Sequence, residues 1–161
     1  MNPDQTIPST SGKLAASATA TFSGIEASIL LGGEGAPMTV MAMQVSPDQG
    51  APAHISFEED KLFLITEGQF EFLIGDDRLS ASAGDHVFVG RGIVHGFVAL
   101  AAAPARMTLM STPARHDRFF MAMGQLPVPH DRDQVEDICH QYRQAIVGPV
   151  ISVEIGTKSQ T

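Results

Sequence analysis

HISFEEDKLFLITEG, residues 54–68, and GDHVFVGRGIVH, residues 84–95, are the two stretches that decide the fold. Each contains a short run of apolar, β-branched or aromatic residues that ends at glycine, the composition of a strand followed by a turn. Each also contributes one histidine at a place where a β-barrel would aim it inward, His54 in the first stretch and His95 in the second.

The sequence around these stretches predicts further strands, each a short run that ends at a turn. Residues 22–31 end at two glycines, and residues 38–45 alternate between two faces before a Ser-Pro-Asp turn. The other predicted strands are Leu62–Ile65, Phe70–Ile74, Val87–Val89, Val94–Leu100 and Arg106–Ser111. Strands at intervals of roughly ten residues, with a turn between each, indicate an all-β barrel or sandwich.

After Pro113 the hydrophobic pattern changes to the period of a helix. We expect a short helix at residues 113–124 and a second at residues 132–147, with Asp131 or Asp133 as the cap of the second. The second helix carries an apolar stripe, which is expected to pack on the barrel or on a second subunit. The stripe consists of Val135, Ile138, Cys139, Tyr142 and Ile146. The histidines expected to face solvent are His116, His130 and His140.

The length of 161 residues and the hydrophobic content of 43% are those of a chain that buries one core. We expect one barrel domain at residues 21–112, a flexible arm at residues 1–20, and a helical extension and tail at residues 113–161. The N-terminus lacks the basic and apolar segments of a signal peptide, and no apolar run is long enough to span a bilayer. A cytoplasmic protein is therefore expected.

Charge and cysteine content exclude several classes of function. The formal net charge is -8 and the sequence has no basic cluster, so neither nucleic acid nor an anionic membrane is an expected partner. The single cysteine, Cys139, has no partner for an internal disulfide, which agrees with a reducing compartment. Its place on an apolar helical face favours a buried structural thiol over a nucleophile.

The spacing of glycines and histidines in the two stretches resembles the two motifs of the cupin superfamily, in its quercetin-dioxygenase-like subgroup. His54 takes the first histidine of the first motif and Gly68 closes it. In the second motif the matching residues are Gly84, Gly92 and His95. The resemblance covers roughly residues 22–112 and implies a double-stranded β-helix (jelly-roll) barrel with appended C-terminal helices. It also implies that the motifs meet inside the barrel, at a site that usually holds a metal.

Two of the four metal ligands that this family uses are replaced here. Ser56 stands where the motif has its second histidine, and Lys61 stands where it has a glutamate. A tightly bound catalytic metal usually needs at least three N or O ligands, and a lysine ammonium repels a cation. We therefore expect no cofactor. The alternative is one divalent transition metal held by His54, His95 and Asp60.

The replacements leave a site with two imidazoles, an amine and a hydroxyl, from His54, His95, Lys61 and Ser56. If Lys61 points into the apolar barrel, burial disfavours its charged form and lowers its pKa. It would then act as a base, as an oxyanion donor when charged, or as an amine that condenses with a carbonyl. Strand alternation does not decide its direction, because both faces of residues 61–65 are apolar. The other arrangement has Lys61 facing outward, paired with Glu59 or Asp60.

Three functions are compatible with this site, since cupins host many chemistries. The first is a metal-independent enzyme that performs acid–base chemistry on a small apolar carbonyl or hydroxylated substrate, as an isomerase, cyclase, dehydratase or lyase. The second is a metal-dependent, quercetinase-like dioxygenase that uses His54, His95 and a nearby carboxylate. The third is a non-catalytic small-molecule binding or sensor protein.

The expected partners are a small-molecule substrate and a second copy of the chain. Apolar edge strands and the helical stripe would be buried against that copy. C2 symmetry is the commonest closed arrangement of identical subunits, so a homodimer is expected.

Overall fold

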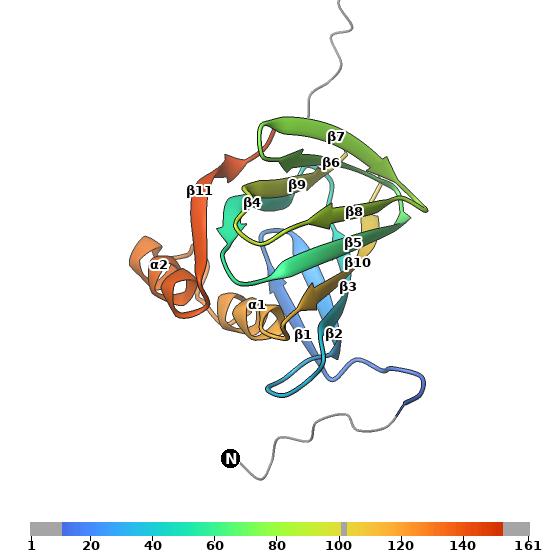
Figure 1. The fold of residues 1–161 in the computed structure, drawn as a ribbon. Coiled ribbons are helices and arrows are strands. Elements are labelled where there is room, and N and C mark those ends of the chain that lie inside the picture. Colours follow the sequence, from blue (N-terminus) through green and yellow to red (C-terminus); the bar gives the residue numbers. More distant parts are fainter. Residues whose placement is uncertain (1–10, 101–102, 153–161) are drawn as a thin grey trace, which may run out of the picture.

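Strands dominate the described chain, which comprises residues 11–100 and 103–152 of this computed structural model. They form two antiparallel sheets that face each other as in a jelly roll (Figure 1). The first sheet contains, in spatial order, β1 (Ala18–Phe22), β2 (Ile25–Leu31), β3 (Thr39–Val45), β10 (Ala105–Thr112), β5 (Asp60–Glu67) and β8 (His86–Val89). The second contains β11 (Gln144–Val150), β4 (Gly50–Ser56), β9 (His95–Ala99), β6 (Gln69–Ile74) and β7 (Asp77–Ser82). The predicted all-β jelly-roll barrel is confirmed.

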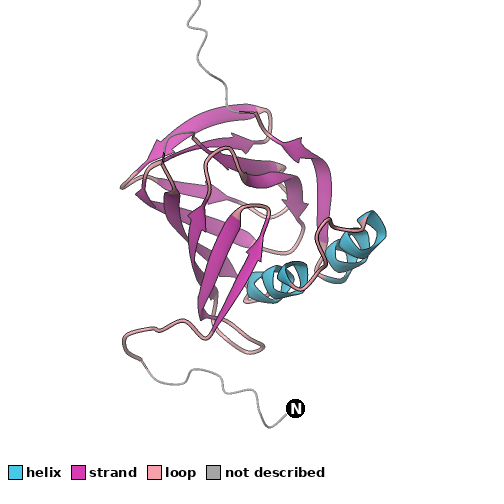
Figure 2. Ribbon diagram, turned by 180° about the vertical axis from the view of Figure 1, so that it is seen from behind, coloured by secondary structure: helices cyan, strands magenta, loops and turns pink. Residues whose placement is uncertain are grey.

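The two helices, α1 (His116–Gly124) and α2 (Arg132–Gln141), lie on the same side of the barrel (Figures 1 and 2). Helix α1 packs beside β1, and α2 packs beside β11. Asp131 caps α2, because its side chain accepts a hydrogen bond from the Gln134 backbone N–H at 3.1 Å. The buried side chains of α1 include Phe119, Phe120 and Met123.

The core lies between the inner faces of the two sheets. Strand β5 illustrates the period of two: Lys61, Phe63 and Ile65 are buried, whereas Leu62 and Leu64 are only half-buried. A cluster of rings with centroids 5.3 to 6.1 Å apart joins the sheets, because one ring belongs to β5 and the others to β6 and β9. The rings are those of Phe63, Phe70, Phe72 and Phe97.

The strand register places the two motif histidines and the lysine on opposite sheets. His54 on β4 and His95 on β9 are direct partners in the second sheet. Lys61 on β5 is paired with Val89 and Ser111 in the first sheet. Closing one sheet over the other therefore brings an amine toward two adjacent imidazoles.

The single strand predicted at residues 22–31 is wrong at its start, because β1 and β2 form a hairpin there. Ser23 and Gly24, with φ of 53° and 71°, form the tight turn between the two strands. Strand β4 was not among the predicted strands, because Pro52 and the small residues around it lack a strand-like pattern.

The second predicted helix, residues 132–147, is wrong after Gln141, where α2 ends, and residues 144–147 belong to strand β11. The chain leaves α2 through Tyr142 and Arg143, the latter with a φ of 57°, and then pairs with β4. Ile146, which the helical pattern assigns to the apolar stripe, lies opposite His54 in this strand pair. The edge of β4 offers backbone hydrogen-bonding groups, and pairing with them outweighs the weak helical preference of this β-branched segment.

The remaining expectations concern the N-terminal arm, the homodimer, Cys139 and membrane-spanning segments. Strand β1 begins at Ala18, inside the range predicted as an arm, and residues 1–10 lie outside the described residues. The arm and the homodimer stay predictions. Cys139 is a buried free thiol, as expected. Neither helix of the described ranges has the length and apolar character that crossing a membrane requires.

We predict that Gly50→Ala destabilises the fold and that Gly90→Ala does not. A Cβ at Gly50 on β4 would overlap the backbone carbonyl oxygen of Phe97 on the paired strand β9. At Gly90 the nearest atom to such a Cβ is Phe88 Cε1 at 3.9 Å, an ordinary contact. In urea unfolding, Gly50→Ala should lower the free energy of unfolding by about 3 kcal/mol and Gly90→Ala by less than about 0.5 kcal/mol. Equal effects of the two variants would contradict this account.

Candidate functional site

Lys61 is buried between the two sheets, with 2% of its surface exposed. Its Nζ lies 3.2 Å from His54 Nε2 and 3.0 Å from His95 Nε2. The two imidazole rings lie beside each other, with centroids 4.1 Å apart. Lys61 therefore faces inward, and the structure brings three of the predicted site residues together. We call His54, Lys61 and His95 the lysine cluster.

Hydrogen bonds at the far nitrogen of each ring fix the tautomers of the two histidines. His54 Nδ1 lies 2.7 Å from the Pro52 carbonyl oxygen, and His95 Nδ1 lies 2.9 Å from the Ile93 carbonyl oxygen. Because a carbonyl oxygen only accepts, each Nδ1 carries a proton and donates it. In the neutral rings each Nε2 is then an acceptor, and the Lys61 amine donates to both.

Burial lowers the pKa of all three groups, because apolar surroundings disfavour their charged forms. Burial lowers the pKa of Lys61 from 10.5 to about 7, and the Glu59 carboxylate offsets part of this shift. Burial and the charge of Lys61 lower the pKa of His95 to about 2. The same two causes, with His95 as a third, hold the pKa of His54 well below 6.5. Near neutral pH the imidazoles are therefore uncharged, while the amine gains and loses a proton.

A second buried pair, Glu59 and His116, lies beside the lysine cluster. His116, the first residue of α1, is 2% exposed, and its Nδ1 lies 2.9 Å from Glu59 Oε2. The expectation that His116 faces solvent is therefore wrong. Helix α1 turns this ring inward, where it stacks on Phe119 with centroids 5.5 Å apart. We call these two residues the Glu59–His116 pair.

The Glu59–His116 pair is a carboxylate beside a neutral imidazole. Burial raises the pKa of Glu59. Contact with His116 and the charges of Lys61 and Arg115 lower this pKa by more than burial raises it, so the net shift is downward. Burial and the charge of Lys61 lower the pKa of His116, against the opposing effect of Glu59. Although the geometry at His116 Nδ1 falls outside that of a hydrogen bond, the Glu59 carboxylate 2.9 Å away favours the tautomer that carries its proton on Nδ1. Nε2 of the neutral ring is then a proton acceptor.

Ser56, predicted to join the lysine cluster, makes its hydrogen bond with Gln144 instead. Its Oγ donates to Gln144 Oε1 at 2.5 Å. The amide nitrogen of Gln144 lies 3.5 Å from both carboxylate oxygens of Glu59 and 3.1 Å from the Tyr142 carbonyl oxygen. Ser56 therefore fixes the amide that faces Glu59.

A cavity of about 400 Å³ lies against both groups of polar residues. Its polar wall includes His54, Lys61, His116 and Gln144. Most of the remaining wall is apolar and includes Phe22, Phe63, Phe97, Phe119, Phe120 and Ile146. His130, expected to face solvent, is half-buried and also lines the cavity, whereas His140 is exposed as predicted. A cavity of this size and lining fits a small, largely apolar molecule with one polar end.

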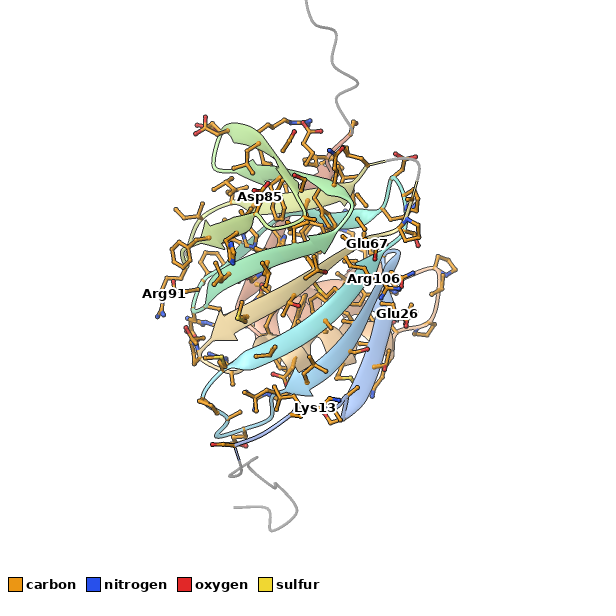
Figure 3. The ribbon with its side chains drawn as sticks, turned by 90° about the vertical axis from the view of Figure 1, so that its right-hand side faces the viewer. Lys13, Glu26, Glu67, Asp85, Arg91 and Arg106 are labelled. Atoms are coloured by element: carbon orange, nitrogen blue, oxygen red, sulfur yellow. The ribbon has the colours of Figure 1, made fainter. Side chains whose placement is uncertain are left out.

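The residues of the lysine cluster do not fit a divalent metal ion. Nε2 of His54 and Nε2 of His95 both contact the Lys61 amine, which takes the place where a shared metal would have to lie. Within residues 11–100 and 103–152, no group of three or more His, Cys, Asp or Glu side chains is arranged to hold a metal. Asp60, the predicted third ligand of the alternative site, pairs with Arg91 at 3.0 Å. Figure 3 shows Arg91 at the outer surface of the barrel. The strand period sends Asp60 and Lys61 to opposite faces.

Three residues of the site were not predicted from the sequence, although the spacing of two of them in the sequence indicates an inward side chain. Glu59 precedes Lys61 by the strand period of two, so an inward Lys61 implies an inward Glu59. His116 shares the i, i+3, i+4 spacing of a buried helical face with Phe119 and Phe120. No local pattern identifies Gln144, whose position depends on the pairing of β11 with β4.

Comparison with known proteins agrees with this architecture. A family model described as a cupin domain matches residues 41–111. No curated protein matches the chain.

Solved structures with the same fold have low sequence identity to this chain. An RmlC-like cupin from Shewanella frigidimarina is 18% identical at a TM-score of 0.57, over 67% of this chain and 96% of that one. KdgF from Halomonas sp. is 20% identical at a TM-score of 0.54, over 63% of this chain and 92% of that one. TT1209 from Thermus thermophilus is 21% identical at a TM-score of 0.53, over 60% of this chain and 90% of that one. At these identities the likeness shows the fold alone.

We predict that the wild-type protein binds no stoichiometric transition metal and that Lys61→Glu gains one. The substitution replaces a cation by a carboxylate beside His54 Nε2 and His95 Nε2, which supplies a three-ligand set. Elemental analysis after expression in medium supplemented with Fe, Mn, Ni and Zn measures both proteins. About one metal ion per wild-type chain would contradict the prediction.

We also predict that Lys61 makes the stability of the protein depend on pH above neutrality. Because burial lowers the pKa of Lys61 from 10.5 to about 7, the unfolded chain binds more protons than the folded chain between these two values. The free energy of unfolding should therefore rise with pH in this window, by up to about 1.4 kcal/mol per pH unit. Lys61→Met should lose this rise, while Lys13→Met, at an exposed position, should keep it. Urea unfolding at several pH values measures the slopes, and parallel slopes for wild type and Lys61→Met would refute a buried, shifted amine.

Proposed function

We propose that the chain, whose residues 41–111 match a cupin domain, is a metal-independent enzyme that transfers protons on a small, largely apolar carbonyl or hydroxylated compound. One observation carries the proposal. A buried amine with a pKa of about 7, that of Lys61, lines an apolar cavity and is held by two neutral imidazoles. A group whose pKa lies near the working pH is suited to take up a proton and to return it.

In the proposed reaction Lys61 is the base. Its neutral amine takes a proton from a carbon next to the substrate carbonyl, and the electron pair of the C–H bond passes into the enolate. The resulting ammonium has three N–H bonds, of which two donate to His54 Nε2 and His95 Nε2. The third N–H bond carries the abstracted proton and remains next to the substrate. The imidazoles thus stabilise the ammonium without taking the proton, because their own pKa values are far lower.

The Glu59–His116 pair supports the charges that develop in this reaction. The Glu59 carboxylate favours the ammonium form of Lys61 by its negative charge. His116 lines the cavity, where Nε2 accepts a hydrogen bond from a substrate hydroxyl. Return of the proton to a different carbon makes the reaction an isomerisation. Departure of a group from the enolate makes it a dehydration or a lyase reaction, and attack on a second carbonyl makes it a cyclisation.

We predict that the protein accelerates deuterium exchange at the acidic C–H bonds of small aromatic ketones and aldehydes. Suitable probes are 2-tetralone, 1-indanone and phenylacetaldehyde in D2O, with exchange followed by NMR. The exchange rate should rise with pH through about 7 and then level off, because the neutral amine of Lys61 is the active form. Lys61→Met should lose at least about a hundredfold of the acceleration, since it removes the base.

Lys13→Met is the matched control, because it makes the same substitution at an exposed position. It should exchange at the wild-type rate. If the protein does not change the deuterium exchange rate of any probe, the proton-transfer function is contradicted. The binding or sensor function would then be favoured, in which the cavity binds a ligand without turnover. Full activity of a folded Lys61→Met variant would show that the base lies elsewhere.

A further inference from the structure

The Lys61 amine has one direction that its protein partners leave open. A neutral amine carries two N–H bonds and one lone pair. His54 Nε2 and His95 Nε2, both acceptors, lie 3.2 and 3.0 Å from Nζ and take the two N–H bonds. The lone pair is what remains for a molecule in the cavity, whose wall includes Lys61.

The surroundings of this lone pair favour nucleophilic attack on a carbonyl carbon. An exposed lysine is protonated and hydrated near neutral pH, so its nitrogen is not a nucleophile there. At Lys61 the wall is largely apolar, and the aromatic rings of Phe63 and Phe97 line the same cavity. A desolvated amine in an apolar pocket is the arrangement that condenses with carbonyl compounds.

We propose that Lys61 forms a covalent imine with small apolar aldehydes and ketones, of the size of about one or two rings. The proposal rests on the proposed function, because it assumes that the same cavity accepts carbonyl compounds. It goes further, since a base needs no covalent bond to its substrate. The covalent bond would place the carbonyl carbon at a fixed point of the cavity.

The condensation needs no reagent beyond the two partners. The nitrogen lone pair attacks the carbonyl carbon, and the carbonyl π electrons move to oxygen. A proton passes from nitrogen to this oxygen and gives a carbinolamine with one hydroxyl group. Departure of this hydroxyl as water, with a second proton from nitrogen, leaves the C=N bond of the imine. Addition of water reverses every step and regenerates the free amine.

The Glu59–His116 pair is placed to move these protons. His116 lines the cavity together with Lys61, and its Nε2 is an acceptor while Nδ1 faces Glu59 at 2.9 Å. The ring takes a proton from the nitrogen of the carbinolamine and returns it to the departing oxygen. During this transfer the Glu59 carboxylate balances the charge of the imidazolium. In this role His116 assists the reaction, and Lys61 remains the residue that is covalently modified.

Reductive trapping tests the proposal with an internal control, because the chain has three lysines, Lys13, Lys61 and Lys158. Wild-type protein is incubated at pH 7 with 2-naphthaldehyde and sodium cyanoborohydride, which reduces an imine to a stable amine. Peptide mass spectrometry then compares the three lysines. Lys61 should be labelled faster than Lys13 by on the order of a hundredfold, because an ordinary lysine is almost fully protonated at this pH. The same reaction in urea should remove the preference, and Lys61→Met should remove the fast label.

The outcomes separate this inference from the proposed function. Equal labelling of Lys61 and Lys13 in the folded protein overturns the imine, even if ketone exchange still depends on Lys61, which then acts as a base alone. Fast labelling of Lys61 supports the imine even if no ketone undergoes exchange, in which case the proton-transfer function fails. Labelling of Lys61 that stays fast in urea also overturns the inference, because it would not come from the folded cavity.

Discussion

The site depends on keeping a lysine amine inside a protein core, and two hydrogen bonds to imidazole make this possible. An isolated ammonium transferred to such an interior costs several kcal/mol or more, so a buried lysine either loses its proton or finds partners. Lys61 does both, because its pKa falls to about 7 and its nitrogen donates to His54 and His95. The partners are themselves fixed by backbone carbonyls of Pro52 and Ile93, so the geometry does not depend on mobile side chains. In this way the fold holds the buried amine at a defined point.

The buried carboxylate of Glu59 is the counterpart of this arrangement. It is held by His116 and faced by Gln144, and its negative charge opposes the effect of burial on Lys61. Without that charge, burial alone would push the pKa of the amine further down and make it a weaker base. With a closer carboxylate, the amine would stay protonated through the neutral range. The position of Glu59 therefore tunes how readily Lys61 exchanges a proton.

The sequence predicts the barrel and half of the site for physical reasons that are visible in its residues. Strand-like runs that end at glycine predict that His54 and His95 lie inside the barrel. Lys61 draws attention only because it replaces a glutamate that binds metal in the family motif. The direction of Lys61 could not be predicted, because the alternating pattern is masked by leucines on the outer face of β5. The strand after α2 could not be predicted either, because its pairing with β4 is a contact between residues far apart in the chain. Gln144 could not be assigned because it lies on that strand. Glu59 follows the strand period, which becomes informative only once Lys61 is known to point inward, whereas His116 follows the helical spacing of the buried face of α1.

Strand β11 returns to the barrel after α2 and lies along β4 (Figure 1). Residues of α1, α2 and β11 line part of the cavity. The amine and its imidazoles come from β4, β5 and β9, and part of the apolar wall comes from α1, α2 and β11. The barrel strands thus hold the amine and its imidazoles, while the C-terminal segment adds His116, Gln144 and part of the apolar wall. Related barrels could exchange this C-terminal segment and accept differently shaped molecules, while the nitrogen that meets them remains unchanged.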